Sequence, residues 1–416
     1  MAPIRVYYAG EAGEELFARR RREPYSGEHV SSTMASRRNE LLKLMRLEDD
    51  EELARPPRGL PNLGNSCYMG AVLQCLLNTP GRFQTILEVF GSKRLARSCG
   101  EAAGVAVALA RLASEYHGGS GGGTVSDRPH VSGAEKGALA ELKESLGRLD
   151  PRYASCDQQD AYEFLGSLFD ALDTGVAEVL RRFSQMEPSE GFMRCIFGVG
   201  TYSVRKCLQC SHTFHSDLRT EITLGLPLIT PAAQSDAELR SLEESAPVSL
   251  PDLLEQAGRL EILEDYECDS CRVLAEEGFR YTKRSRLAQR SGLLSDASEV
   301  LIIALYRFLN IADADGNFEA VKLRRPVSIP ASLSLPIGKY RLHGIVSHSG
   351  EELSSGHYTA AVQSCANGLW YHCDDSYVEP LPSRRLDAED ANVTRVRPGA
   401  DPFILFYHRV GTGGRR

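Results

Sequence analysis

The stretch GLPNLGNSCYMGAVLQ, residues 59–74, joins a polar turn to an apolar segment at Cys67. Apolar side chains recur at helical spacing over residues 68–76, which predicts a helix that begins at or near Cys67. Asn65 and Ser66 directly precede this cysteine and are the side chains expected to cap the helix. The stretch therefore predicts a cysteine at a helix N-terminus.

Cys67 is a candidate nucleophile because backbone N–H groups at a helix N-terminus favour a thiolate. The tight turn at residues 64–66 is expected to present the sulfur rather than bury it. Asn62 lies shortly upstream, where its amide can donate to an oxyanion that forms at an attacked carbonyl. A buried packing cysteine at a helix start is the alternative.

A general base for this thiol must come from elsewhere, and four of the ten histidines form a late group: His343, His348, His357 and His372. His357 lies between Gly356 and Tyr358 at the mouth of an expected strand, after a flexible segment. Asp374 follows the next expected strand, and an antiparallel pairing would turn its carboxylate towards the imidazole. A structural histidine and a plain Asp-Asp turn are the alternatives.

Four further cysteines form two C-x-x-C pairs separated by 57 residues: Cys207 with Cys210, and Cys268 with Cys271. Two such pairs at hairpin tips can close a tetrahedral zinc site that leaves no open position for chemistry. Disulfides or redox-active pairs are the alternative, and His212 and His215 are alternative ligands. We expect one structural zinc ion, held by the four cysteines.

The 416 residues are 42% apolar and 25% charged, the composition of a soluble globular protein of one large or two to three ordinary domains. This composition excludes a mostly disordered, collagen-like or fibrous chain. No apolar run reaches the roughly 18 residues of a membrane-spanning helix, and the N-terminus lacks the apolar region of a secretory signal. Eleven cysteines without such a signal indicate reduced thiols, in the cytoplasm or nucleus. A net charge of −8 argues against general binding to nucleic acid or anionic membranes.

The chain divides into an N-terminal extension and a globular body. Residues 1–58 are expected to be partly disordered, with a short amphipathic helix around residues 41–47 and a basic run at residues 19–22. Residues 411–416 are expected to form a C-terminal tail. The body, residues 59–410, is expected to hold the fold and the site.

The body is expected to be α+β, with helices first and strands later. Helices are predicted over residues 105–112, 134–149 and 157–172, with a flexible loop at residues 115–133. Strands are predicted over residues 197–204, 212–228, 299–308, 340–348, 358–362, 369–373 and 403–407. Polar stretches are expected to separate some of these strands, at residues 231–247 and 287–298.

Four blocks of the sequence, in this order, resemble the ubiquitin-specific proteases, a family of deubiquitinating cysteine proteases. Residues 59–74 look like the family's cysteine box, and QQDAYEFL, residues 158–165, matches its next block. LHGIVSHSGEELSSGHYTAAV, residues 342–362, followed by WYHCDDSYV, residues 370–378, is similar to the histidine box. PFILFYHR, residues 402–409, is similar to the closing strand.

The resemblance implies a papain-like cysteine protease core with thumb, fingers and palm subdomains. The thumb would cover about residues 59–184, the zinc-bearing fingers about residues 191–298 and the palm about residues 299–410. By motif position, the implied catalytic residues are the nucleophile Cys67, the general base His357 and the orienting Asp374. Asn62 would contribute to the oxyanion hole, assisted by Asp375.

The implied activity is hydrolysis of the isopeptide or peptide bond after the C-terminal glycine of ubiquitin, by a monomeric catalytic domain. Ubiquitin and ubiquitinated proteins are the implied partners. Asp160 matches the residue that contacts ubiquitin's basic tail in the family, and Gln158 and Tyr358 are further expected substrate contacts. The alternatives are a catalytically silent ubiquitin-binding scaffold, an enzyme for another ubiquitin-like modifier and, more distantly, a zinc-finger nucleic-acid module.

The chain departs from the family's common pattern at a few positions. Gly70 and Ala71 replace the usual Asn-Ser after the CYM triplet, Ser66 replaces a threonine, and Cys373 stands where phenylalanine is commonest. None of these changes touches the three expected catalytic residues, so the resemblance implies an active enzyme.

Overall fold

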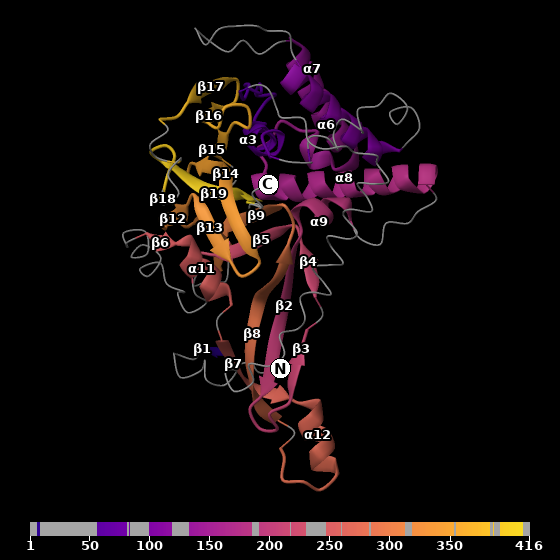
Figure 1. Cartoon of the computed structure of the whole chain (residues 1–416), viewed down its shortest axis with the longest axis vertical. Helices are drawn as coiled ribbons and strands as arrows, with labels where there is room; N and C mark the ends of the chain where they lie inside the picture. Colours follow the sequence, from indigo (N-terminus) through magenta and orange to yellow (C-terminus); the bar gives the residue numbers. More distant parts are fainter. Residues whose placement is uncertain are drawn as a thin grey trace, which may run out of the picture.

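The computed structural model describes most of the globular body and little of the N-terminal extension. The described residues are 6–8, 56–80, 83, 100–118, 133–184, 191–216, 218–229, 247–258, 260–282, 284–312, 318–352, 355–382, 386 and 392–410. The helix expected around residues 41–47, the basic run at residues 19–22 and the tail at residues 411–416 lie outside them. Figure 1 shows a helical part beside a large sheet, and a long arm that extends away from both.

The helical part carries the cysteine box. The described helices of the chain are α3 (Cys67–Leu77), α6 (Glu101–Gly118), α7 (Gly133–Leu149), the 3-10 turn η2 (Pro151–Tyr153), α8 (Ala161–Ser184), α9 (Phe192–Phe197), α11 (Leu250–Ala257) and α12 (Asp269–Glu276). The predicted helices at residues 105–112, 134–149 and 157–172 are confirmed as α6, α7 and α8. Helix α8 begins later than predicted because Asp160 accepts hydrogen bonds from the backbone N–H groups of Tyr162 and Glu163, and so caps the helix.

The large sheet, most of which lies in the range expected for the palm, has eight strands. In spatial order they are β17 (Tyr377–Pro380), β16 (Trp370–Asp374), β15 (His357–Gln363), β14 (Gly338–Ser349), β19 (Ala400–Arg409), β9 (Val300–Tyr306) and β5 (Thr223–Pro227), with β13 (Ser332–Leu335) paired to β14. Two small groups accompany it: β10 (Phe308–Ala312) with β11 (Phe318–Lys322), and β6 (Val248–Ser249) with β12 (Val327–Pro330) and β18 (Asn392–Val393).

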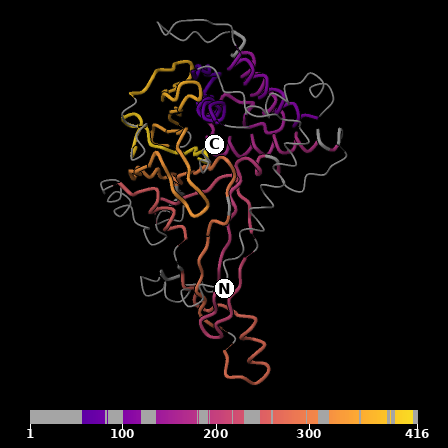
Figure 2. Tube along the Cα trace, viewed as in Figure 1, coloured from indigo at the N-terminus to yellow at the C-terminus, as the bar shows by residue number. Residues whose placement is uncertain are grey.

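Both faces of this sheet are covered. One apolar cluster joins α3, α6 and α8 to β9, β15 and β19, and a second cluster packs α11 against the other face. Val300 and Ile302 of β9 enter the first cluster, whereas Leu301 and Ile303 enter the second, which explains why this strand is apolar without alternation. This packing brings together segments that are far apart in the sequence. As Figure 2 shows, α3 lies against β14, β15 and β16, the strands of the histidine box.

The arm, which corresponds to the fingers, is a second sheet of long strands. Its order is β1 (Val6–Tyr8), β7 (Leu260–Glu267), β8 (Arg284–Ala297), β2 (Val199–Cys207) and β3 (Thr213–His215), with β4 (Arg219–Glu221) also paired to β2. The predicted strand at residues 212–228 is therefore divided into β3, β4 and β5.

The expectation of a polar separator at residues 287–298 is wrong, because these residues form most of β8. The strand is polar because it lies in an arm with little core, and its backbone is paired on both sides, with β2 and with β7. Polar side chains also pair across the strands, as Arg205 does when it donates to Gln289 at 2.8 Å. Residues 231–246 lie outside the described residues.

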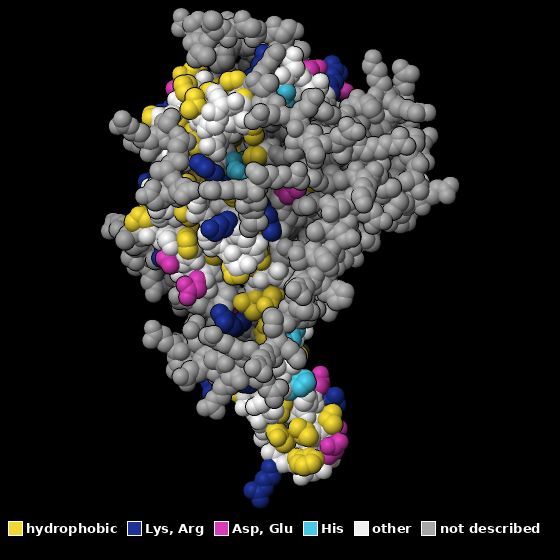
Figure 3. Space-filling view, in the orientation of Figure 1, with side chains coloured by type: hydrophobic (Ala, Val, Ile, Leu, Met, Phe, Trp, Pro, Cys, Tyr) yellow, Lys and Arg dark blue, Asp and Glu magenta, His cyan; other side chains and the backbone are white. Residues whose placement is uncertain are grey.

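Apolar side chains gather at the tip of the arm, over α12 (Figure 3). Val273 and Phe279 are 46% and 58% exposed there. Among the described helices, none combines the length and apolar character needed to cross a bilayer.

Candidate active site

Cys67 is the first residue of α3, as the sequence predicts. The predicted capping by Asn65 and Ser66 is wrong. Ser66 holds the N-cap position without a side-chain bond to the helix, because its Oγ turns back to accept from the N–H of Leu63 at 2.8 Å. Asn65 donates instead to the carbonyl of Cys156 at 2.9 Å, and so ties the turn to the segment before α8.

Asn62 is the residue that shapes this turn. Its Oδ1 accepts from the backbone N–H groups of Gly64 at 3.1 Å and Ser66 at 3.0 Å. The expectation of an exposed cysteine is wrong, since Cys67 is only 4% exposed. The reason is the position of α3, whose eleven residues are all buried between α8 and the strands β14 and β15.

The structure brings His357 to the thiol and to Asp374. His357 is the first residue of β15 and Asp374 is the last residue of the adjacent strand β16. The Nε2 of His357 and the Oδ1 of Asp374 are 2.6 Å apart. The hydrogen bond with Cys67, and next that with Asp374, outweigh burial and raise the pKa of His357 from 6.5 to about 9. The three predicted catalytic residues therefore meet, with the imidazole between sulfur and carboxylate.

The other three members of the histidine group are buried and have lowered pKa values. Burial lowers the pKa of His348 to about 4 and that of His343 well below its usual value. His372 is also buried, and this lowers its pKa. All three rings are therefore neutral at neutral pH, and His357 is the member of the group whose pKa is raised.

Asn62 and Asp375 lie together beside the triad. The Nδ2 of Asn62 donates to the Oδ2 of Asp375 at 3.0 Å, and the backbone N–H of Leu60 donates to the Asp375 carbonyl at 2.9 Å. Burial raises the pKa of Asp375. One amide proton of Asn62 is thus held by Asp375, which fixes the orientation of the amide and leaves its second proton for an oxyanion.

The expected substrate contacts surround the start of α8. Asp160 caps that helix, and burial raises the pKa of its carboxyl group. Gln158 is half-buried, and its Nε2 is buried without a hydrogen-bond partner.

Two features near these contacts were not singled out from the sequence. Glu163 is an exposed carboxylate in the first turn of α8, paired with Arg152 at 2.6 Å. Tyr162 of α8 meets Tyr306 of β9 edge to face, with ring centroids 6.1 Å apart, so the helical part and the sheet touch here. Glu163 belongs to the QQDAYEFL block, so the motif could have identified it. The Tyr162–Tyr306 contact joins distant segments, so no local sequence pattern predicts it.

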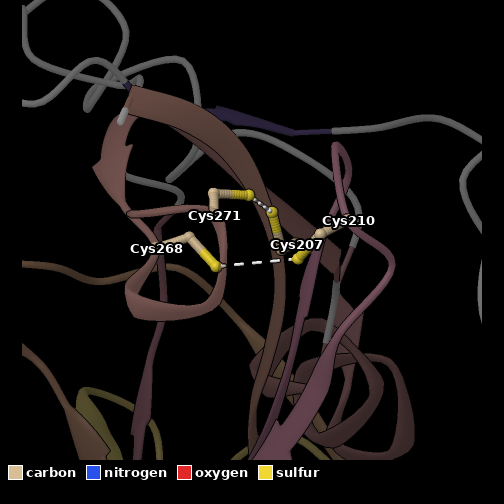
Figure 4. A group of neighbouring side chains, drawn as sticks. All are labelled: Cys207, Cys210, Cys268 and Cys271. Carbon is tan, nitrogen blue, oxygen red and sulfur yellow. Dashed lines mark hydrogen bonds between the residues drawn. The ribbon is translucent and has the colours of Figure 1, made fainter. Parts of the chain in front are cut away.

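The four paired cysteines converge at the far end of the arm (Figure 4). The sulfurs of Cys207 and Cys271 are 3.6 Å apart, and those of Cys210 and Cys268 are 3.8 Å apart. All four sulfurs lie within 4.8 Å of one another. A tetrahedral zinc ion with Zn–S bonds of about 2.3 Å separates its sulfurs by about 3.8 Å, so the four thiols fit this metal. These distances are too long for a disulfide, and His212 and His215 do not belong to the group.

Comparisons with known proteins agree with this geometry. The family model described as ubiquitin carboxyl-terminal hydrolase matches residues 58–407. The chain is 29% identical to ubiquitin carboxyl-terminal hydrolase 25 of Arabidopsis thaliana, over 85% of this chain and 47% of that protein. It is 27% identical to ubiquitin carboxyl-terminal hydrolase 42 of Homo sapiens, over 88% of this chain and 24% of that protein. The chain thus spans about half or less of the length of these relatives.

Solved structures show the same fold. The SAGA Ubp8/Sgf11/Sus1/Sgf73 DUB module bound to ubiquitin aldehyde is similar with a TM-score of 0.63 and 18% identity, over 93% of this chain and 76% of that chain. A yeast SAGA DUB module is similar with a TM-score of 0.59 and 19% identity, over 88% of this chain and 72% of that chain. Since the family model covers most of the chain and the papain-like core with its cysteine-bearing fingers is present, this chain belongs to the ubiquitin carboxyl-terminal hydrolase family, with the architecture of the ubiquitin-specific proteases.

Proposed function

We propose that this protein is a thiol-dependent deubiquitinase that cleaves the isopeptide or peptide bond after the C-terminal glycine of ubiquitin. The observation that carries the proposal is the meeting of Cys67, His357 and Asp374, from three distant parts of the chain, beside an amide donor. Relatives named ubiquitin carboxyl-terminal hydrolases and a similar structure bound to ubiquitin aldehyde support the choice of substrate.

We propose a task for each of these residues in the reaction. The Cys67 thiolate attacks the carbonyl carbon of the terminal glycine, and the second amide proton of Asn62 stabilises the oxyanion. His357, protonated because its pKa is about 9, gives its proton to the departing lysine amine. It then takes a proton from the water that releases the acyl-enzyme, while Asp374 holds the ring through Nε2.

The start of α8 provides the contacts for ubiquitin's basic, extended tail. Gln158, half-buried just before this helix, contacts the backbone of the tail. Glu163 is exposed and exchanges Arg152 for an arginine of the substrate, while the half-buried Asp160 fixes the start of the helix. A bound zinc ion would tie together the tip of the arm, which we propose grips the body of ubiquitin, and would take no part in the chemistry. The reduced thiols that this site requires favour the cytoplasm or nucleus.

The test is incubation of the zinc-loaded protein with ubiquitin that bears an electrophilic C-terminus. We expect a covalent adduct at Cys67, detected by intact mass and peptide mapping, and none with Cys67→Ala. Matching probes built on other ubiquitin-like modifiers show whether Cys67 reacts with ubiquitin or with another modifier. Absence of an adduct in a protein that still binds ubiquitin would instead support the silent scaffold.

A further inference from the structure

Lys322, the last residue of β11, is a buried cation outside the catalytic site. Its side chain is 1% exposed. The Nζ donates to the carbonyl of His348 at 3.1 Å and to the carbonyl of Gly350 at 2.8 Å, and it lies 3.2 Å from the Oδ2 of Asp401. The ammonium group therefore donates to two carbonyls and has a carboxylate as its ion-pair partner, which is what a buried charge requires.

The two carbonyls belong to the end of β14, where the chain turns towards the base. Ser349 is paired with His357 in the ladder between β14 and β15. Gly356 has a φ of +141°, and a Cβ there would lie 2.3 Å from the Ser349 oxygen and 2.5 Å from the His348 Nε2. The backbone directly before His357 thus rests against residues 348–349, and the position of these residues sets the position of the imidazole.

Asp401 anchors the ammonium group from the other side of β14. It lies on β19, in register with His348, and is 2% exposed. Its Oδ1 accepts from the Nε of Arg395 at 2.9 Å. Lys322 therefore joins three separate pieces of backbone: β11, the end of β14 and β19.

We propose that Lys322 is a positioning residue for the catalytic base His357, which it holds in reach of Cys67 through the carbonyls of His348 and Gly350. It does not touch the reacting atoms. The inference rests on the proposed function only in naming His357 as the base; the geometry it describes can be tested without ubiquitin.

The test removes the charges of Lys322 and Asp401 together in Lys322→Met/Asp401→Asn. Lys322→Met alone would leave Asp401 without its buried partner and could unfold the protein. The asparagine still accepts from Arg395. On a fluorogenic ubiquitin amide we expect kcat to fall about 10-fold to 100-fold with KM within about threefold, since misplaced catalytic groups lose rate rather than binding. We also expect the rate of alkylation of Cys67 by iodoacetamide near pH 7 to fall at least about fivefold.

The matched control is Arg324→Met/Glu351→Gln, which removes an ion pair between the same two segments of chain. Arg324 and Glu351 are 30% and 75% exposed at their side chains, so this pair contributes little. We expect kcat and the alkylation rate of this variant within about twofold of wild type.

The outcomes separate positioning from a merely structural role. If kcat and alkylation are unchanged in the Lys322 double variant, the proposal is overturned. The same holds if both fall only in proportion to the folded fraction in thermal melts. Should that variant fail to fold, Lys322→Gln/Asp401→Asn keeps a donor for one carbonyl. We expect kcat and the alkylation rate of this variant to lie below those of wild type. Wild-type values of both in the folded variant contradict the assignment. A wild-type protein inactive on ubiquitin, yet alkylated at Cys67 in a Lys322-dependent way, would overturn only the proposed function.

Discussion

The two ring nitrogens of His357 have different tasks. Its Nε2 faces Asp374, which leaves Nδ1 for the sulfur of Cys67. The raised pKa, about 9, keeps the ring protonated at neutral pH. The charge also links folding to pH: the stabilisation from protonated His357 is complete below its ordinary pKa of 6.5 and disappears as the pH rises through about 9.

Replacing Asp374 with asparagine tests this charge. The substitution removes a hydrogen bond and a negative charge that raise the pKa of His357, so the basic limb of the kcat/KM profile should move down by about 1 pH unit or more. We also expect kcat to fall at least about 100-fold because the ring is less well oriented. The profile is measured with a ubiquitin amide from pH 5 to 10. A basic limb that stays in place would show that Asp374 does not set the pKa of His357.

Replacing Asn62 with aspartate separates its two roles. The carboxylate still accepts from the N–H groups of Gly64 and Ser66, but it cannot donate to an oxyanion and it places a second charge beside Asp375. We expect kcat to fall about 100-fold or more with a small change in KM. Thermal melts check that the turn persists. A loss of stability with unchanged kcat in the folded protein would leave Asn62 a structural residue only.

The turn between β14 and β15 is the element that presents the base, and Gly356 is its most constrained position. A Cβ there meets the Ser349 oxygen at 2.3 Å in a backbone conformation that favours glycine. We expect Gly356→Ala to lower the free energy of unfolding by about 3 kcal/mol and kcat by more than about 10-fold. Gly368→Ala is the control, because Gly368 also has a positive φ but has no neighbour within 4 Å of an added Cβ.

The two glycine variants are compared by urea denaturation and by steady-state kinetics. Gly368→Ala should cost about 1 kcal/mol and leave kcat unchanged. Equal losses in the two variants would mean that the backbone conformation alone restricts residue 356 to glycine, and that the close approach to Ser349 does not.

The zinc site at the tip of the arm predicts a separation of stability from chemistry. We expect about one zinc per chain by metal analysis. Cys207→Ser should lower the free energy of unfolding by about 3 kcal/mol or more, while the rate of Cys67 alkylation stays within about twofold. Cys365→Ser, outside the cysteine group, is the control. A folded, active protein without metal would contradict the prediction.

The elements that sequence patterns reveal best are those with one strong local signal. The helices α6, α7 and α8 follow from apolar spacing, the strand β9 follows from an unbroken apolar run, and the paired cysteines follow from their own motif. The strands of the arm are harder to predict because β8 has a polar pattern, which depends on pairing with β2 and β7 rather than on burial. The prediction that Ser66 caps α3 failed for a similar reason. Asn62, Leu63 and Ser66 form a hydrogen-bonded turn, and in it the Oγ of Ser66 accepts from Leu63 instead of from the helix.

At the scale of the whole molecule, the site exists only because the helical part and the palm share one core. Cys67 comes from α3, and His357 and Asp374 come from neighbouring strands, yet all three elements pack into the same apolar cluster or onto its edge. The motifs predict which residues react. They do not predict Lys322 or the Tyr162–Tyr306 contact, because those depend on how β9, β11 and α8 meet.

The arm extends far from the triad (Figure 1), so its contribution should depend on the size of the substrate. If the arm and α8 bind the body and tail of ubiquitin, binding energy from these remote contacts is available to lower the barrier at Cys67. We expect kcat/KM for a ubiquitin amide to exceed that for the amide of ubiquitin's last five residues by at least about 100-fold. Cys67→Ala should abolish both activities, whereas Cys207→Ser should reduce only the activity on whole ubiquitin. Equal kcat/KM values for the two substrates would mean that the arm contributes nothing to catalysis and that the tail alone is recognised.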